Sequence, residues 1–122
     1  MAFSFVKRLQ SFRHAFRGVK YLAVSQHNAW IHSVATVVVI GLGLFFKIHR
    51  TDWLWLTVAI ALVWMAEAFN TAIEVLADEV SQEHRVRIGR AKDVAAGAVL
   101  IAAMGAVVIG VVVFEPYCLR YN

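Results

Sequence analysis

An uncharged stretch of 21 residues, 94–114, constrains this chain more than any other feature of its sequence. As an α-helix it would be about 31 Å long at ~1.5 Å per residue, which matches the hydrocarbon core of a bilayer. Of the 122 residues, 61% are hydrophobic and 16% are charged, whereas soluble domains contain about 45–50% and roughly 25%. So short a chain could not bury this much apolar surface as a water-soluble monomer. The sequence therefore predicts an integral membrane protein.

Two further apolar stretches, residues 29–46 and 53–77, are long enough to cross a bilayer. The turn between them, residues 47–52, is short, so we expect an antiparallel helical hairpin. In the stretch 94–114, small residues recur every four positions, a spacing that lets membrane helices approach closely. These small residues are Ala98, Ala102, Ala106 and Gly110. We expect residues 1–122 to form a single membrane-embedded domain with three transmembrane helices.

Residues 1–24 are too polar to span a bilayer, but their apolar positions recur at helical spacing. The apolar residues are Phe5, Leu9, Phe12, Phe16 and Val19, and the basic residues, mostly elsewhere on the helical wheel, are Lys7, Arg8, Arg13, Arg17 and Lys20. This pattern predicts an amphipathic helix lying on the membrane surface. The predicted fold is therefore all-α, with three transmembrane helices and one N-terminal surface helix.

The basic residues indicate the orientation in the membrane. Residues 1–30 contain five of the twelve and residues 78–93 contain four, whereas the turn 47–52 contains two and the C-terminus one. Because cytoplasmic loops carry an excess of Lys and Arg, the N-terminus and the segment 78–93 are expected in the cytoplasm. A basic N-terminus can also indicate nucleic-acid binding. In so apolar a chain it favours anionic lipid instead, and we expect no nucleic-acid partner.

Four polar residues of the stretch 53–77 and its end lie within about 80° of one another on a helical wheel. They are Glu67, Asn70, Glu74 and Asp78. If the helix enters the membrane at Trp53, Glu74 lies near the cytoplasmic boundary and Glu67 about 10 Å deeper. Carboxylates are costly inside a membrane and usually functional. A carboxyl group that is hydrogen-bonded within a helix bundle is the structural alternative for Glu67.

The segment that follows is charged throughout. Its charged and titratable residues are Asp78, Glu79, Glu83, His84, Arg85, Arg87, Arg90, Lys92 and Asp93. Carboxylates can bind Mg²⁺, and Lys and Arg can bind phosphates, a combination that phosphoryl transfer requires. The usual nucleotide-binding loops are absent from the sequence. From these residues alone, a kinase, a small proton-coupled transporter and a non-catalytic assembly subunit all stay open.

Two motifs then resemble those of a known family. Residues 67–78, EAFNTAIEVLAD, resemble the pattern E-x-x-N-[ST]-A-[IL]-E-x-x-x-D of the prokaryotic diacylglycerol kinases, a family that includes undecaprenol kinases. Residues 91–100, AKDVAAGAVL, resemble its A-K-D-x-A-A-G-A-V-L block, and Phe16-Arg17-Gly18 resembles an N-terminal aromatic-basic-glycine element. The resemblance covers the chain from about residue 5 to residue 115.

This resemblance implies an activity and a cellular location. Such enzymes transfer the γ-phosphate of ATP, with Mg²⁺, to the hydroxyl of a membrane lipid. The expected reaction is phosphorylation of diacylglycerol to phosphatidic acid, with phosphorylation of undecaprenol as the alternative. The resemblance also implies a homotrimer in the bacterial inner membrane, with the active site on the cytoplasmic side.

The resemblance further implies roles for individual residues. Glu67 corresponds to the catalytic base and Glu74 to a ligand of Mg²⁺. The residues expected around ATP are Arg8 (or its neighbour Lys7), Asn70, Glu74, Glu83, Lys92 and Asp93.

The chain departs from the family pattern at one position that matters for the metal. Gln26 stands where the family commonly has a second metal-ligating Glu, and an amide oxygen can bind Mg²⁺ but brings no charge. The residues Glu83-His84-Arg85 also stand where Glu-Tyr-His is frequent. His32 is interpreted as a hydrogen-bonded packing residue, and nothing in the sequence assigns chemistry to Cys118.

Overall fold

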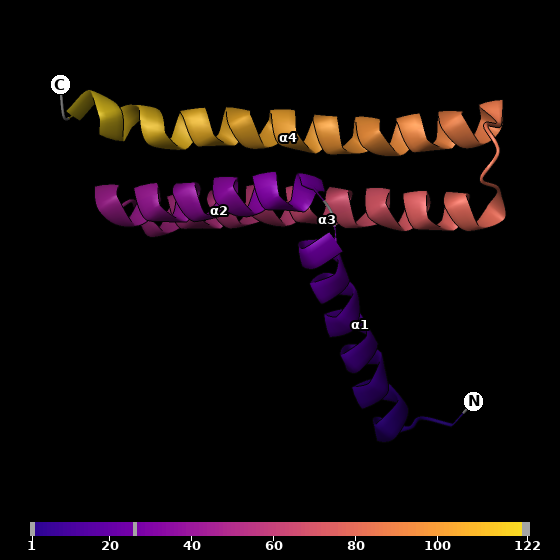
Figure 1. The fold of residues 1–122 in the computed structure, drawn as a ribbon. Helices are drawn as coiled ribbons and strands as arrows, with labels where there is room; N and C mark the ends of the chain where they lie inside the picture. The colour runs from indigo at the N-terminus through magenta and orange to yellow at the C-terminus, as the bar shows by residue number, and fades with distance from the viewer. Residues whose placement is uncertain (1, 26, 121–122) are drawn as a thin grey trace.

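The computed structural model describes residues 2–25 and 27–120, and this part of the chain is helical apart from short connections. The four helices are α1 (Phe5–Ser25), α2 (His27–Phe46), α3 (Arg50–Val80) and α4 (Val86–Arg120), drawn in Figure 1. Three of them, α2, α3 and α4, are long and apolar enough to cross a membrane. The all-α class and the three predicted spans are therefore confirmed.

Helices α3 and α4 are longer than the predicted spans 53–77 and 94–114. They contain 31 and 35 residues, or about 46 and 52 Å, and so exceed a hydrocarbon core of ~30 Å. Apolarity ends at the bilayer boundary, but Arg, Lys and Glu are good helix formers in water, so the helices continue. The segment 78–93, expected as a charged loop, is consequently helical except at residues 81–85.

A tight turn joins α2 to α3. The Ile48 N–H donates to the Gly43 carbonyl at 3.2 Å and the Lys47 N–H to the Leu44 carbonyl at 3.3 Å, the two bonds of a Schellman motif. Lys47 has a positive φ of 51°, at a position usually occupied by Gly. Trp53, in the first turn of α3, folds back against Gly43. This turn holds α2 and α3 as the expected antiparallel hairpin.

The buried apolar core lies at the turn end of the bundle, between α3 and α4. Its buried members are Ile48, Leu56, Val113 and Tyr117. The Tyr117 hydroxyl donates to Asp52 Oδ2 at 2.5 Å and accepts the His49 N–H at 2.9 Å, which ties the end of α4 to the start of α3. Helices α3 and α4 pack against each other along their length (Figure 1).

The small residues of α4 lie along this α3–α4 contact. Ala98, Ala102 and Ala106 line a groove whose other wall includes Ala59 of α3. By contrast, large apolar side chains on the outer faces of α2 and α4 are exposed, among them Val37, Leu44 and Ile101. An apolar exterior is what helices in contact with lipid require.

Helix α1 runs at a steep angle to the bundle, and its N-terminal end extends away from the other helices (Figure 1). Leu22, near its C-terminal end, is buried. The apolar residues along α1, from Phe5 to Val19, are exposed.

Candidate active site

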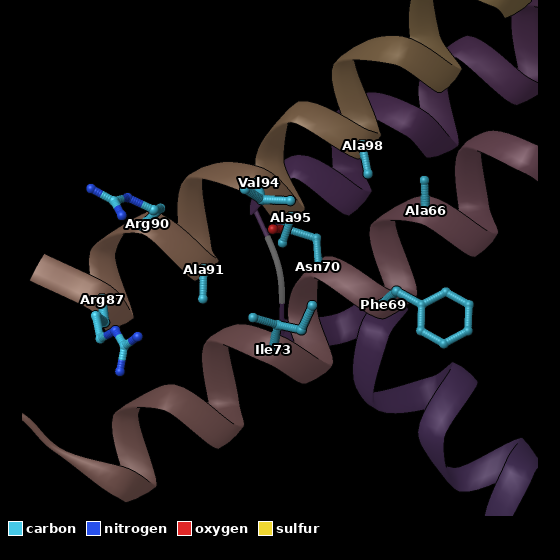
Figure 2. Close-up of a pocket in the computed structure, with 10 residues that line it drawn as sticks. All are labelled: Ala66, Phe69, Asn70, Ile73, Arg87, Arg90, Ala91, Val94, Ala95 and Ala98. Carbon is cyan, nitrogen blue, oxygen red and sulfur yellow. The ribbon is translucent and has the colours of Figure 1, made fainter.

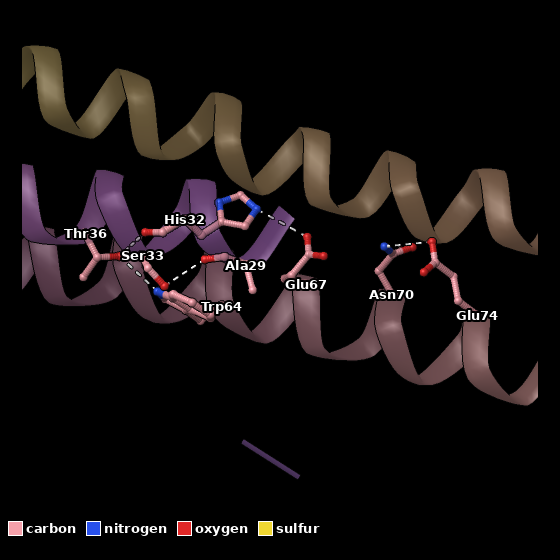
Figure 3. Close-up of polar contacts among 8 residues, drawn as sticks. All are labelled: Ala29, His32, Ser33, Thr36, Trp64, Glu67, Asn70 and Glu74. Atoms are coloured by element: carbon pink, nitrogen blue, oxygen red, sulfur yellow. Dashed lines mark hydrogen bonds and ion pairs between the residues drawn. The ribbon is translucent and has the colours of Figure 1, made fainter. Parts of the chain in front are cut away.

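The polar residues of α3 share the face that packs inside the bundle. Glu67, Asn70 and Thr71 are the buried polar side chains of the described chain, with 1%, 5% and 4% of their surface exposed, and Glu74 is half-buried. Figure 3 shows the side chains of Glu67, Asn70 and Glu74 directed toward α4. The helical wheel therefore predicted the clustering of these three residues. Within the described residues the Thr71 hydroxyl has no hydrogen-bond partner, and this buried residue was not predicted.

Glu67 faces a histidine from the neighbouring helix. His32 Nε2 on α2 lies 3.3 Å from Glu67 Oε2 (Figure 3), although the contact lacks hydrogen-bond geometry. Sequence reasoning missed this partner, since a helical wheel describes one helix at a time. The hairpin offered a signal, because His32 and Glu67 are each about 17 residues from the middle of the turn 47–52. Residues equidistant from the turn of an antiparallel hairpin lie at the same depth.

Asn70 and Glu74 follow Glu67 by about one and two helical turns, toward the C-terminal end of α3, and both side chains carry oxygen atoms. Asn70 Nδ2 lies 3.5 Å from Glu74 Oε1, and in residues 2–25 and 27–120 the buried Asn70 Oδ1 has no hydrogen-bond partner. Mg²⁺ prefers oxygen ligands and commonly takes only one or two protein carboxylates, with phosphates supplying others. No group of three His, Cys, Asp or Glu side chains converges within the described residues. The Glu74 carboxylate and the Asn70 amide oxygen could supply one or two such ligands.

The basic residues lie on the first turns of α4, beside this polar face. Lys92 Nζ forms an ion pair of 2.6 Å with Asp78 Oδ1, the fourth polar residue of the predicted face. Arg87 and Arg90 line the same groove as Asn70 (Figure 2), which has a volume of about 620 Å³ and otherwise mainly apolar walls. The structure therefore brings guanidinium groups, an amide and apolar surface together at one end of the bundle.

The structure does not bring the other predicted residues to this polar face. Arg8 lies in the N-terminal half of α1, stacked 5.6 Å from the Phe3 ring centroid, and this half of α1 extends away from the bundle. Glu83 is exposed in the 81–85 connection, where its N–H donates to Ser81 Oγ at 3.1 Å. Asp93 is exposed on α4. The predicted metal ligand Gln26 lies outside the described residues.

The chain is similar to known proteins over most of its length. Residues 13–114 match the family model of the prokaryotic diacylglycerol kinases. The chain is 33% identical to the undecaprenol kinase of Bacillus subtilis over 107 residues. These aligned residues are 88% of this chain and 87% of the relative. It is 39% identical over 103 residues to a diacylglycerol kinase of Synechocystis, covering 84% of this chain and 59% of the relative.

A third relative, the diacylglycerol kinase of Escherichia coli K12, is 25% identical over 104 residues, which are 85% of each chain. The matched region contains the polar face of α3, the basic start of α4 and the hairpin. The chain belongs to the prokaryotic diacylglycerol kinase family and is a membrane-embedded lipid kinase.

Proposed function

We propose that this enzyme transfers the γ-phosphate of ATP, with Mg²⁺, to the hydroxyl of diacylglycerol, giving phosphatidic acid and ADP. This proposal rests on one observation: the buried carboxylate of Glu67 lies on the same face of α3 as Asn70 and Glu74. The basic first turns of α4 lie next to this face. Phosphoryl transfer depends mainly on positioning and on neutralising phosphate charge. Both requirements have candidate groups here.

Glu67 is the proposed general base. Its carboxylate takes the proton of the lipid hydroxyl, while the hydroxyl oxygen forms a bond to the γ-phosphorus and the bond from this phosphorus to the β-phosphate bridging oxygen breaks. ADP leaves with the electron pair of the broken bond. The position of Glu67 on the same face of α3 as Asn70 and Glu74 supports this role, because a general base must lie within reach of the reacting groups (Figure 3).

Mg²⁺ would be held by Glu74 and by the free Asn70 oxygen, with Gln26 as a further neutral ligand. The ion would neutralise charge on the nucleotide phosphates. Lys92 would supply positive charge to the same phosphates and exchange its partner Asp78 for them. Arg8, Glu83 and Asp93 are the remaining residues of the proposed nucleotide site. None of them lies on the polar face in this structure, and Arg8 would need a different placement of α1 to reach it.

We place the proposed binding site of the lipid acceptor in the groove that Asn70 lines. Phe69, Ile73 and Val94 contribute apolar wall, which suits acyl chains, and Arg87 and Arg90 lie where the polar headgroup would meet water (Figure 2). This arrangement would place a lipid hydroxyl on the same side of α3 as the carboxylates. Undecaprenol also ends in a single hydroxyl, and the relatives include both a diacylglycerol kinase and an undecaprenol kinase. Undecaprenol is therefore the alternative acceptor.

The assay is transfer of radiolabelled phosphate from ATP to lipid by the purified enzyme in mixed micelles. Diacylglycerol and undecaprenol are supplied in parallel at equal mole fraction. We expect labelled phosphatidic acid, its loss on chelation of Mg²⁺ by EDTA, and its recovery on adding Mg²⁺. A product formed only from undecaprenol would overturn the choice of lipid, and the absence of both products would overturn the proposed reaction.

We also propose a homotrimer in the bacterial inner membrane, with the N-terminus and the site in the cytoplasm and α1 on the membrane surface. The exposed apolar side chains of α1, such as Phe12 and Phe16, support the surface helix. The excess of basic residues in 1–30 and 78–93 supports the orientation. The mass of the detergent-solubilised particle tests the trimer, and cysteine accessibility at each end of the helices tests the orientation.

A further inference from the structure

The contact between His32 and Glu67 joins two polar side chains inside the membrane part of the bundle. Their nearest atoms, His32 Nε2 and Glu67 Oε2, are 3.3 Å apart, and the side chains are 16% and 1% exposed. Among the described residues, no hydrogen bond satisfies Glu67 Oε2. A buried carboxylate oxygen without a partner is costly. The imidazole is therefore the group placed to compensate this oxygen.

The imidazole lies beside an indole ring that is hydrogen-bonded to the neighbouring helix. The Trp64 Nε1–H donates to Thr36 Oγ1 at 3.0 Å, and the Thr36 hydroxyl donates to the His32 carbonyl at 2.7 Å. The fixed indole of Trp64 packs against the His32 ring in an edge arrangement, with 6.1 Å between the ring centroids. Figure 3 shows these residues side by side on α2 and α3. The bond between the two helices thus fixes the position from which His32 reaches Glu67.

We propose that His32 is a positioning residue for Glu67, an inference that rests on the proposed role of Glu67 as base. In this proposal the imidazole nitrogen, 3.3 Å away, orients the carboxylate through Oε2, and the second carboxylate oxygen, directed away from the imidazole in Figure 3, accepts the proton of the lipid hydroxyl. A base is effective when a third group orients it. His32 has no contact with substrate in this arrangement and acts through the carboxylate.

The test compares side chains at position 32 that differ in one property. His32→Phe keeps an aromatic ring against Trp64 but has no nitrogen, and His32→Gln keeps an N–H donor without the ring. Ser33→Ala is the matched control, because Ser33 is the next residue along α2 and its hydroxyl donates to the Ala29 carbonyl of its own helix, at 2.8 Å. Thermal unfolding and steady-state phosphorylation of diacylglycerol are measured for each enzyme.

We expect His32→Phe to lower kcat by about tenfold or more, since general-base catalysis supplies ~10²–10⁴ and misorientation forfeits part of it. The KM values for ATP and lipid should stay within about twofold, because binding is not lost. His32→Gln should recover most of kcat, and Ser33→Ala should match wild type. A folded His32→Phe enzyme with wild-type kcat, or one with only KM raised, overturns the proposal.

Two further comparisons keep the result decisive. If His32→Phe does not fold, His32→Gln and His32→Met, of similar length, are compared, and equal kcat values for the two overturn the proposal. In a Glu67→Gln background, removing the imidazole should have little further effect on kcat, because the group it positions is gone. If Glu67→Gln alone keeps full activity, the proposed base is wrong. If Glu67→Gln lowers kcat but the position-32 variants keep the wild-type kcat, the role of Glu67 as base is retained and the positioning role of His32 is wrong.

Discussion

The close approach of Trp53 to Gly43 predicts a specific loss of stability when a methyl group is added. A Cβ atom built on Gly43 would lie 2.6 Å from Trp53 Cη2 and 2.9 Å from Cζ2, and 3.2 Å from Ile48 Cδ1. Ordinary carbon contacts are about 3.5–4.0 Å. In Gly43→Ala the indole must therefore move by nearly 1 Å.

The indole has little freedom to make this movement, because Trp53 packs against the buried cluster that contains Leu56 and Tyr117. Inserting atoms into such a contact typically costs ~1–3 kcal/mol. Ala also forms helix more readily than Gly, by up to ~1 kcal/mol in water, so the clash must be separated from this gain. Gly41→Ala makes the same change two residues earlier, where a Cβ would meet nothing within 4 Å.

The assay is equilibrium unfolding in mixed detergent micelles, followed by circular dichroism. We expect Gly43→Ala to be less stable than Gly41→Ala by about 1–3 kcal/mol. Trp53→Phe should cost less in the Gly43→Ala background than in wild type, because the shorter ring vacates the space that the methyl group occupies. Equal stability of the two alanine variants, or additivity in the double variant, would refute this account of the turn.

Two further predictions separate the stability of the bundle from its activity. Tyr117→Phe removes the bonds to Asp52 and His49 at the turn end, so the melting temperature should fall by a few degrees while kcat is unchanged; a fall in kcat at wild-type stability would count against it. Lys92→Met should raise the KM for ATP about tenfold through loss of a charge-assisted contact, measured by steady-state kinetics. Asp78→Asn breaks the same exposed ion pair and should change stability by less than ~1 kcal/mol and leave the KM near wild type. Equal KM values for these two variants would contradict the role of Lys92.

The three spans and the polar face of α3 were predictable because each is a property of one helix. The uncharged run 94–114 indicates a span by its length, and the spacing of Glu67, Asn70 and Glu74 places them on one face. Helices α3 and α4 extend beyond the predicted transmembrane spans, since hydropathy reports where lipid ends and not where the helix ends. Lys92 and Arg90 are accordingly on a helix and not in a loop.

Contacts between helices were harder to predict from the sequence. His32 was interpreted as a packing residue because a histidine in a helix that enters the membrane is more often hydrogen-bonded within the protein than a ligand, and its partner Glu67 appears only when the hairpin is folded. The link from Tyr117 to Asp52 joins residues 65 positions apart and has no sequence pattern of its own. Such pairs depend on how the helices are rotated against one another, which the packing of many side chains decides together.

The central claim is that Glu67 takes the proton of the lipid hydroxyl, and the kcat of Glu67→Gln tests it most directly. Gln is nearly isosteric with Glu but cannot accept this proton. Glu115→Gln is the matched control. It makes the same change at an exposed carboxylate near the C-terminal end of α4, away from the basic first turns of this helix. We predict that Glu67→Gln lowers kcat for diacylglycerol phosphorylation at least about a hundredfold while the folded protein and the control behave as wild type. A Glu67→Gln enzyme with a kcat within twofold of wild type would contradict the claim.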